Sequence, residues 1–172
     1  EVIARVIKME GRAQLRSLSN DYFNEEVRPG LPIKNGDAIK VNEKGLCIIM
    51  YVDDKSIVKI RENTQFEFLE TQNTRTIELK YGTILNSVNS LKNIKTFRVQ
   101  TPVSVASVKG TEFAATSMQN GIDQFVCKEG SFEVLNMISG ETVLVGPNQK
   151  AVSNSSGSLM KSMAAPGDYP NE

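Results

Sequence analysis

The sequence predicts an all-β fold, and three observations support this prediction. Apolar and polar residues alternate along short segments that are rich in β-branched and aromatic residues, as in half-buried strands. These segments recur about every eight to twelve residues, with Gly, Asn, Asp or Pro between them, a spacing typical of sandwiches, barrels and solenoids. Few segments carry a helical period, and no βαβ unit is visible. We therefore expect a twisted, multi-stranded β-sandwich or β-solenoid-like domain.

The first half of the chain divides into short strands separated by turn residues. Gly11 is expected to kink the first alternating segment, and Gly82 to end a later one. Pro29-Gly30 indicates a loop, and Asn35-Gly36 indicates a tight turn because both residues tolerate a positive φ. The expected strands cover residues 2–9, 11–18, 38–41, 46–52, 56–60, 65–70, 76–81 and 84–88.

The second half continues the same pattern up to a polar tail. Its strands are expected at residues 96–100, 103–108, 112–116, 122–128, 131–137 and 141–145. Asn120-Gly121, Glu129-Gly130 and Ser139-Gly140 supply turns between them. Beyond residue 152 the chain is rich in Ser, Asn, Gly and Pro, a composition that favours irregular structure. We therefore expect an all-β domain at residues 1–152 and an extended polar tail at residues 153–172.

The composition argues against several classes of function. Lys plus Arg and Asp plus Glu both number 20, so the net charge is zero and no cationic cluster marks a nucleic-acid surface. The chain has no histidine, which removes the usual nucleophile–base pairs and imidazole metal sites. Glu25-Glu26 and Asp53-Asp54 are poor acid–base pairs, because neighbours in a strand point to opposite faces. We expect no catalytic residue, no cofactor and no metal, and hence a protein that is not an enzyme.

One segment carries the most specific pattern of the chain. Residues 97–113 consist of two strand halves joined by a Thr-Pro step and closed by Lys-Gly-Thr-Glu-Phe. This arrangement resembles the FecR domain, a module of bacterial extracytoplasmic proteins. The matching residues are Phe97, Val99, Thr101, Pro102, Val103, Val105, Ala106, Val108, Lys109, Gly110, Thr111 and Phe113.

The resemblance extends over most of the chain, from about Gly11 to Val145, because shorter elements occur in the same order as in the family. They are Gly11-Arg12-Ala13 with Leu15, Gly36-Asp37 with Ile39, Val52 to Ser56, Tyr81 to Ile84, and Cys127 to Gly130 with Phe132 and Val134. Lys55 stands where the family usually has Gly.

Six residues of the signature form the expected structural motif: Thr101, Pro102, Val108, Gly110, Thr111 and Phe113. Gly110 lies between two inward-facing strand segments, where it would allow a bulge or a positive φ. The Thr111 hydroxyl can then hydrogen-bond to the backbone of the turn. We expect Val99, Val103, Val105, Val108 and Phe113 to be largely buried, together with Phe125, Phe132 and Val134.

The two cysteines, Cys47 and Cys127, leave two alternatives open. They could form one disulfide in an oxidising compartment. Each also lies within an apolar run, so both could be small core residues instead.

The resemblance implies a location outside the cytoplasm of a bacterium, in the periplasm, at the cell surface or secreted. The chain begins at Glu1, which is the pattern of a mature chain whose leader was removed. The best-known family members relay a signal from an outer-membrane transporter to a sigma factor.

Two functions follow as expectations. The first is a non-enzymatic structural or protein-interaction module, in particular a self-assembling surface or filament subunit whose partner is another copy of itself. The second is a periplasmic ligand-sensing or signal-transduction domain of the sigma-factor regulator type, which would bind a peptide or a glycan. No segment is apolar and long enough to span a membrane, since the longest purely apolar run, residues 46–52, is far shorter than the about 20 residues required. Contacts of the tail should distinguish the two, because a neighbouring subunit or its own domain could hold it in place.

Overall fold

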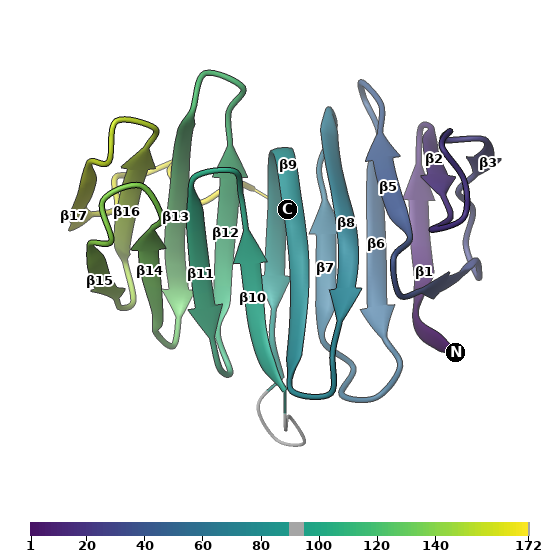
Figure 1. Ribbon diagram of the computed structural model, residues 1–172, viewed down its shortest axis with the longest axis horizontal. Coiled ribbons are helices and arrows are strands. Elements are labelled where there is room, and N and C mark those ends of the chain that lie inside the picture. The colour runs from purple at the N-terminus through teal and green to yellow at the C-terminus, as the bar shows by residue number, and fades with distance from the viewer. Residues whose placement is uncertain (90–94, 172) are drawn as a thin grey trace.

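The computed structural model describes residues 1–89 and 95–171, which form seventeen strands and no helix. This confirms the all-β prediction. The strands make two sheets, here called A and B, that lie face to face as two layers (Figure 1). Sheet B is the layer nearer the viewer in that figure.

Each sheet is described by the order in which its strands pair. Sheet A runs β4 (Pro32–Lys34), β1 (Val2–Glu10), β6 (Leu46–Tyr51), β7 (Ile57–Ile60), β9 (Thr74–Ser87), β12 (Glu112–Ser117), β13 (Ile122–Glu129), β16 (Gln149–Asn154) and β17 (Leu159–Met163). Sheet B runs β3 (Glu25–Glu26), β2 (Ala13–Arg16), β5 (Ala38–Val41), β8 (Thr64–Glu70), β9, β10 (Thr96–Gln100), β11 (Ser104–Val108), β14 (Phe132–Asn136) and β15 (Thr142–Val145).

Strand β9 belongs to both sheets. Its first part pairs with β8 and β10 in sheet B, and its last part pairs with β7 and β12 in sheet A. The change of sheet occurs around Gly82, whose φ of 105° is open to glycine and strained for other residues. Gly82 was expected to end a strand, and it instead lets one strand cross between the layers.

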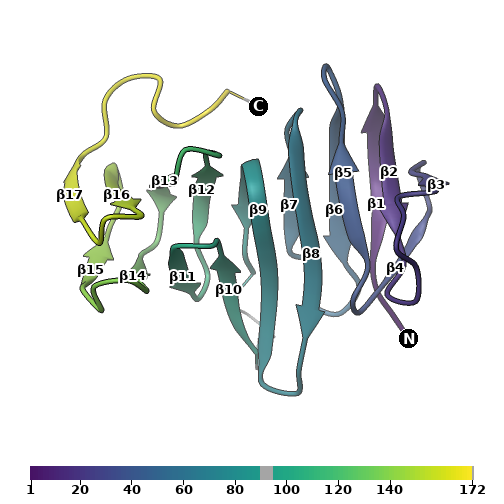
Figure 2. The ribbon, with the colours of Figure 1, turned by 45° about the horizontal axis from the view of Figure 1, so that its top comes forward.

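Hairpins alternate between the two sheets along the second half of the chain. The pairs β10–β11 and β14–β15 lie in sheet B, and β12–β13 and β16–β17 lie in sheet A. Each hairpin then joins the next hairpin of its own sheet, through β11–β14 and β13–β16. The pairing of β9 with β10 is parallel, whereas the other pairings among the described strands are antiparallel. Successive hairpins therefore follow one another in chain order along the sandwich, as Figure 2 shows.

The core is a single apolar layer between the sheets. Because side chains alternate between the two faces of a strand, every second residue points into this layer. Its largest fully buried side chains are aromatic or branched and include Tyr51, Phe66, Phe68, Phe97, Phe113 and Phe125. The cluster extends from Ala4 in β1 to Leu159 in β17, and every strand contributes to it except β3, whose two glutamates are exposed.

Two expectations about burial and boundaries need correction. Val105 was expected inside, but it is only half-buried, because the inward positions of β11 are Ser104, Ala106 and Val108. The tail was expected from residue 153, yet β16 continues to Asn154 and β17 pairs with it. The sheet therefore extends across the expected boundary, and after β17 only residues 164–171 of the described chain remain outside it.

Candidate functional site

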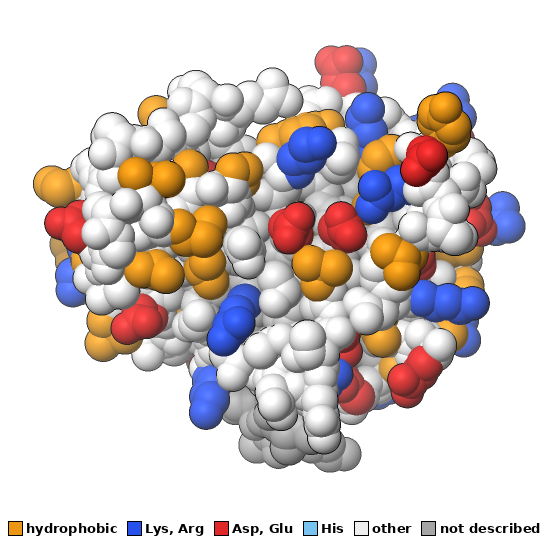
Figure 3. Space-filling model, viewed as in Figure 1, with side chains coloured by type: hydrophobic (Ala, Val, Ile, Leu, Met, Phe, Trp, Pro, Cys, Tyr) orange, Lys and Arg blue, Asp and Glu red, His pale blue; other side chains and the backbone are white. Residues whose placement is uncertain are grey.

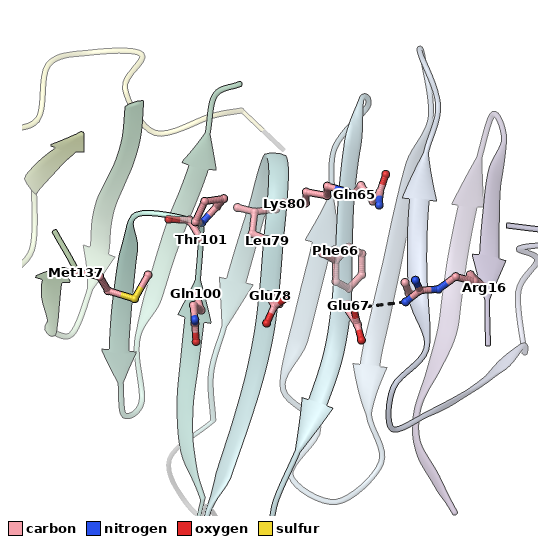
Figure 4. Close-up of a pocket in the computed structure, with 12 residues that line it drawn as sticks. Arg16, Gln65, Phe66, Glu67, Glu78, Leu79, Lys80, Gln100, Thr101 and Met137 are labelled. Atoms are coloured by element: carbon pink, nitrogen blue, oxygen red, sulfur yellow. Dashed lines mark ion pairs between the residues drawn. The ribbon is translucent and has the colours of Figure 1, made fainter. Parts of the chain in front are cut away.

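A groove with a volume of about 420 Å³ crosses the outer face of sheet B. It is bounded by β2, β5, β8, β9 and β10 and by the turn that follows β10 (Figure 4). The strand register places four of its residues in one row, because Ala38 is paired with Glu67, Glu67 with Glu78, and Glu78 with Gln100. The groove is thus a property of the sheet and not of a flexible loop.

Charged side chains occupy the middle of the groove. Glu67 and Glu78 lie directly opposite each other, and two like charges in such a pair destabilise the sheet. Arg16 offsets part of this cost, since its Nη2 lies 3.4 Å from Glu67 Oε2 (Figure 4). No ion pair to Glu78 occurs within residues 1–89 and 95–171, and its side chain is exposed. Glu78 is therefore placed to accept hydrogen bonds from a bound cationic or polar group.

The side of the groove towards β14 is apolar. Pro102 and Met137 line it, and Val105 and Leu135 lie next to each other on the same outer face. Leu144 on β15 extends this surface with 63% of its area exposed. Figure 3 shows apolar side chains gathered on one side of this face and two carboxylates near its centre. A ligand of this groove would therefore need an apolar part beside a polar or cationic one.

The Thr-Pro step of the signature builds the rim of this groove. Thr101 Oγ1 accepts hydrogen bonds from the backbone N–H groups of Val103, at 3.1 Å, and Ser104, at 2.8 Å. Thr101 N also donates to Ser104 O at 2.8 Å, which closes the turn between β10 and β11. Proline suits the second position of such a turn because its φ is already fixed. The Thr-Pro pair thus forms the turn, and Pro102 is exposed to solvent.

A buried polar cluster anchors this turn to the rest of the sandwich. Thr101 donates a hydrogen bond to Asp123 on β13, and Ser104 Oγ donates to the same carboxylate at 2.7 Å. Ser104 Oγ also lies 2.8 Å from Ser153 Oγ, which accepts from Asn136 Nδ2 at 2.9 Å. Buried polar groups are stable when they are hydrogen-bonded in this way. The cluster contains a Ser–Asp pair without an imidazole, so it orders the turn and is no nucleophile–base set.

The Gly-Thr part of the signature makes a second tight turn. Gly110 has a φ of 56°, as the expected positive-φ position requires. Thr111 Oγ1 lies within hydrogen-bond distance of Lys109 O, at 3.0 Å, and Ser131 O, at 2.9 Å. Val108 and Phe113 on either side are buried. Thr111 thus links its own turn to Ser131, in the turn between β13 and β14.

A second buried network consists of charged side chains around Arg75. Arg75 is 2% exposed and forms ion pairs with Asp53 (2.8 Å), Asp54 (3.3 Å) and Glu70. Its guanidinium also lies 3.8 Å from the centroid of the Tyr51 ring. Burial raises the pKa of Asp53, but the Arg75 hydrogen bond and charge hold it below its ordinary value. Asp53-Asp54 is therefore paired with an arginine and is not an acid–base dyad.

The possible disulfide between Cys47 and Cys127 is not formed, and both thiols are free and buried. Cys47 lies on β6 and Cys127 on β13, with β7, β9 and β12 between them in sheet A. Four strand spacings of roughly 4.8 Å separate the two strands, far more than the about 7 Å that a disulfide can bridge between Cα atoms. Sequence patterns could not exclude the bond, because the order of strands in a sheet is not a local property.

No metal-binding group and no membrane-spanning helix are found within the described residues. Their Cys, Asp and Glu side chains form no group of three or more that could hold a metal ion. Within residues 1–89 and 95–171, no helix has the length and apolar character needed to cross a membrane.

The groove residues were not identified from the sequence as a site. Glu67, Glu78 and Lys80 alternate with apolar neighbours, which is the ordinary pattern of a solvated sheet face. The pattern correctly places these side chains outward. The missing information was the register, which brings Glu67 opposite Glu78 and places Gln100 beside Glu78 from another hairpin.

Comparison with known proteins identifies the family. The FecR protein family model matches residues 37–133, which is more than half of the chain. The chain therefore belongs to the FecR protein family, as its signature indicated. No protein of curated function matches the chain.

Two solved structures share the fold. Both are crystal structures of a protein from Parabacteroides distasonis ATCC 8503 described as a putative anti-sigma factor, at 2.50 Å and 1.65 Å resolution. They align with TM-scores of 0.66 and 0.65 at 20% sequence identity. Each alignment covers 76% of this chain and 61% of the other chain, so this chain spans about three fifths of the neighbour's length.

These findings correct the first functional expectation. The chain matches the FecR protein family, and its structural neighbours are described as putative anti-sigma factors, so neither comparison supports a filament subunit. The expectation of a self-assembling surface or filament subunit is wrong. Residues 164–171 also fold back on their own domain, for example through the 2.9 Å contact between Lys150 and Asp168, so order in the tail does not require a second copy.

Proposed function

We propose that this chain is a non-enzymatic sensing module of an extracytoplasmic signal-transduction regulator, of the type that controls a sigma factor. The observation that carries the proposal is the FecR family match over residues 37–133. This range contains the strands that carry Glu67, Glu78 and Gln100 across the groove of sheet B. The structural neighbours described as putative anti-sigma factors are consistent with the same role.

The groove of sheet B is the proposed contact site for a partner protein. Its carboxylates can accept hydrogen bonds from a basic side chain, and the neighbouring Pro102 and Met137 can pack against an apolar one. A groove of this kind fits a peptide segment better than a rigid small molecule, because it is open along the sheet and combines both kinds of surface.

The test is genetic and uses a bacterium that carries the gene. Deleting the gene should change the transcript levels of a defined set of genes, and the wild-type gene should restore them. Glu78→Lys, which reverses the charge in the groove, should fail to restore them although the protein accumulates normally. Glu43→Lys makes the same charge change at an exposed position in the turn between β5 and β6, and it should restore them fully. An unchanged transcript profile after deletion would refute the regulatory role, and full restoration by Glu78→Lys would refute the groove as its contact site.

A further inference from the structure

Residues 164–171, here called the strap, cross the outer face of sheet A. Ala164 N donates a hydrogen bond to Asn148 O at 2.8 Å, and Lys150 Nζ lies 2.9 Å from Asp168 Oδ2. Further along, the Tyr169 ring lies 5.5 Å from Lys128 Nζ, and the carbonyl of Asn171 accepts a hydrogen bond from Arg61. Figure 2 shows the chain arching from β17 towards the middle of the molecule. The strap thus spans the sheet from β16 to the end of β7.

The surface below the strap is a short apolar row with a lysine at each end. Register places Leu85 beside Ala114 and Ala114 beside Val126, and their exposed fractions are only 5%, 2% and 3%. Lys59 lies next to Leu85, and Lys150 lies next to Val126. The three apolar residues face outward, because the buried core side chains of these strands are their neighbours in sequence. The strap lies against this row, because strap residues share the linings of the pockets at Val126 and at Leu85.

The strap fills this surface incompletely. Cavities of about 380 Å³ and about 280 Å³ remain along it, the first against Val126 and the second against Leu85, and Tyr169 lines both. The strap has no regular structure, because it contains Pro166, Gly167 and Pro170. None of its residues joins the sheet as a strand. Because the strap is not paired with a strand of the sheet, a better-fitting segment could displace it.

We propose that the outer face of sheet A is a docking surface for an extended segment of a partner protein, in which an acidic residue is followed by an aromatic one. The strap occupies this surface as an intramolecular competitor. Its own contacts define the chemistry: a carboxylate at Lys150, and an aromatic ring beside Lys128, between the cavities at Val126 and at Leu85. This surface is on the opposite sheet from the groove of the proposed function, and the inference does not depend on that groove.

A peptide titration of the full chain tests the proposal. The probe is a synthetic peptide with the sequence of residues 164–171, and the protein is either wild type or the full-length double variant Asp168→Asn with Tyr169→Ala. We expect at least tenfold tighter binding to the double variant, because its own strap competes less well. NMR shifts should be centred on Leu85, Ala114 and Val126. No binding to the double variant, equal affinity for both proteins, or shifts centred on sheet B would overturn the proposal.

Reversing the charges at residue 150 and at the Asp of the peptide provides a control that does not alter the core. Lys150→Glu in the double variant should weaken binding of the peptide at least tenfold, and a peptide with Lys in place of its Asp should regain affinity for this protein. Val105→Arg, on the outer face of sheet B, should leave peptide binding unchanged. If affinity does not follow the charge at residue 150, the carboxylate contact is refuted. If the double variant dimerises through the uncovered face in sedimentation runs, the occupant is a second copy and the partner-segment proposal is wrong.

Discussion

The buried charges around Arg75 show how a single residue holds several strands. Arg75 joins acidic groups from the turn after β6 and the end of β8, and the side chains of Asp54 and Glu70 are only 3% and 9% exposed. A buried ion pair contributes little net stability by itself, but removing one partner leaves the others charged and without compensation. The charge of Arg75 therefore allows the carboxylates of the acidic turn to be buried.

We expect Arg75→Ala to lower the free energy of unfolding by about 3–5 kcal/mol, because it leaves the buried Asp54 carboxylate without a cation, although Glu70 keeps its ion pair with Lys95 at 2.7 Å. Urea denaturation followed by circular dichroism measures this change. Arg12→Ala is the matched control: Arg12 contacts Glu26 at 2.6 Å, but its side chain is 73% exposed, so stability should change little. Equal effects of the two variants would show that burial of the network is not what makes Arg75 important.

Both cysteine thiols should be unreactive in the folded protein. Burial raises the pKa of Cys47 to about 12 and also raises the pKa of Cys127, so neither forms much of the nucleophilic thiolate at pH 8. Titration with a thiol reagent should detect almost no rapid reaction under native conditions and two thiols in denaturant without reductant. Absence of thiols in denaturant would contradict the structure by showing a disulfide.

The sequence predicted the backbone conformation and the burial of single residues well where these properties depend on neighbours in the sequence. The signature correctly indicated a positive φ at Gly110 and burial of Phe113, since both follow from local backbone geometry and alternation. Thr101 was identified as part of the motif, but its bond to Asp123 joins residues from different hairpins and sheets. Long-range contacts of this kind carry no signal in the spacing of residues.

Among the elements, β9 depends most on one position. A Cβ atom on Gly82 would lie 2.1 Å from Thr64 Oγ1, and the φ of 105° is unfavourable for any other residue. Most other strand segments were located correctly because they alternate and end at turn residues. Strand β17 was missed, since Leu159–Met163 has one buried residue and lies in a polar stretch that composition alone assigns to a tail.

Gly82→Ala should lower the free energy of unfolding by at least about 2–3 kcal/mol, from backbone strain together with the overlap at Thr64. Gly140→Ala separates these two causes, because Gly140 has a φ of 79° but no atom within 4 Å of an added Cβ. The control should therefore show only the smaller cost of strain in thermal or urea melts. A Gly82→Ala protein as stable as the Gly140→Ala protein would refute a close crossing between the sheets.

The strap is the element most sensitive to acid. The hydrogen bond from Lys150 lowers the pKa of Asp168 below its ordinary 3.8 in the folded protein. A carboxyl whose pKa is lowered on folding stabilises the folded form above its ordinary pKa, and this contribution is lost as the pH falls through the lowered value. Strap contacts should therefore be constant from pH 8 to pH 5 and weaken below about pH 4.

NMR shifts of Tyr169 and Lys150 follow this change directly. Asp168→Asn should abolish the acid dependence at these two residues and leave other shifts unaffected. Weakening of the strap between pH 8 and pH 5 would show that a group other than Asp168 controls it.

For the molecule as a whole, the two sheets act as a scaffold with two separate outer faces. Sheet B carries an open groove with carboxylates beside an apolar surface, and sheet A carries an apolar row covered by the strap. Both faces depend on the same core, because the residues opposite them in each strand point into it. The FecR signature supports this scaffold through its turns, and the solvent-facing positions between the core residues are where specificity can vary.

The shared core predicts a single cooperative unfolding transition for the whole chain. Strand β9 belongs to both sheets, and the apolar cluster continues from β1 to β17, so neither half retains a complete core when the other unfolds. Phe66→Leu in the first half and Phe125→Leu in the second should each lower the midpoint of one common transition. Calorimetry should give equal calorimetric and van't Hoff enthalpies for both variants and the wild type. If either substitution splits the melting curve into two steps, the halves of the sandwich are separate folding units, and the crossing of β9 does not couple them.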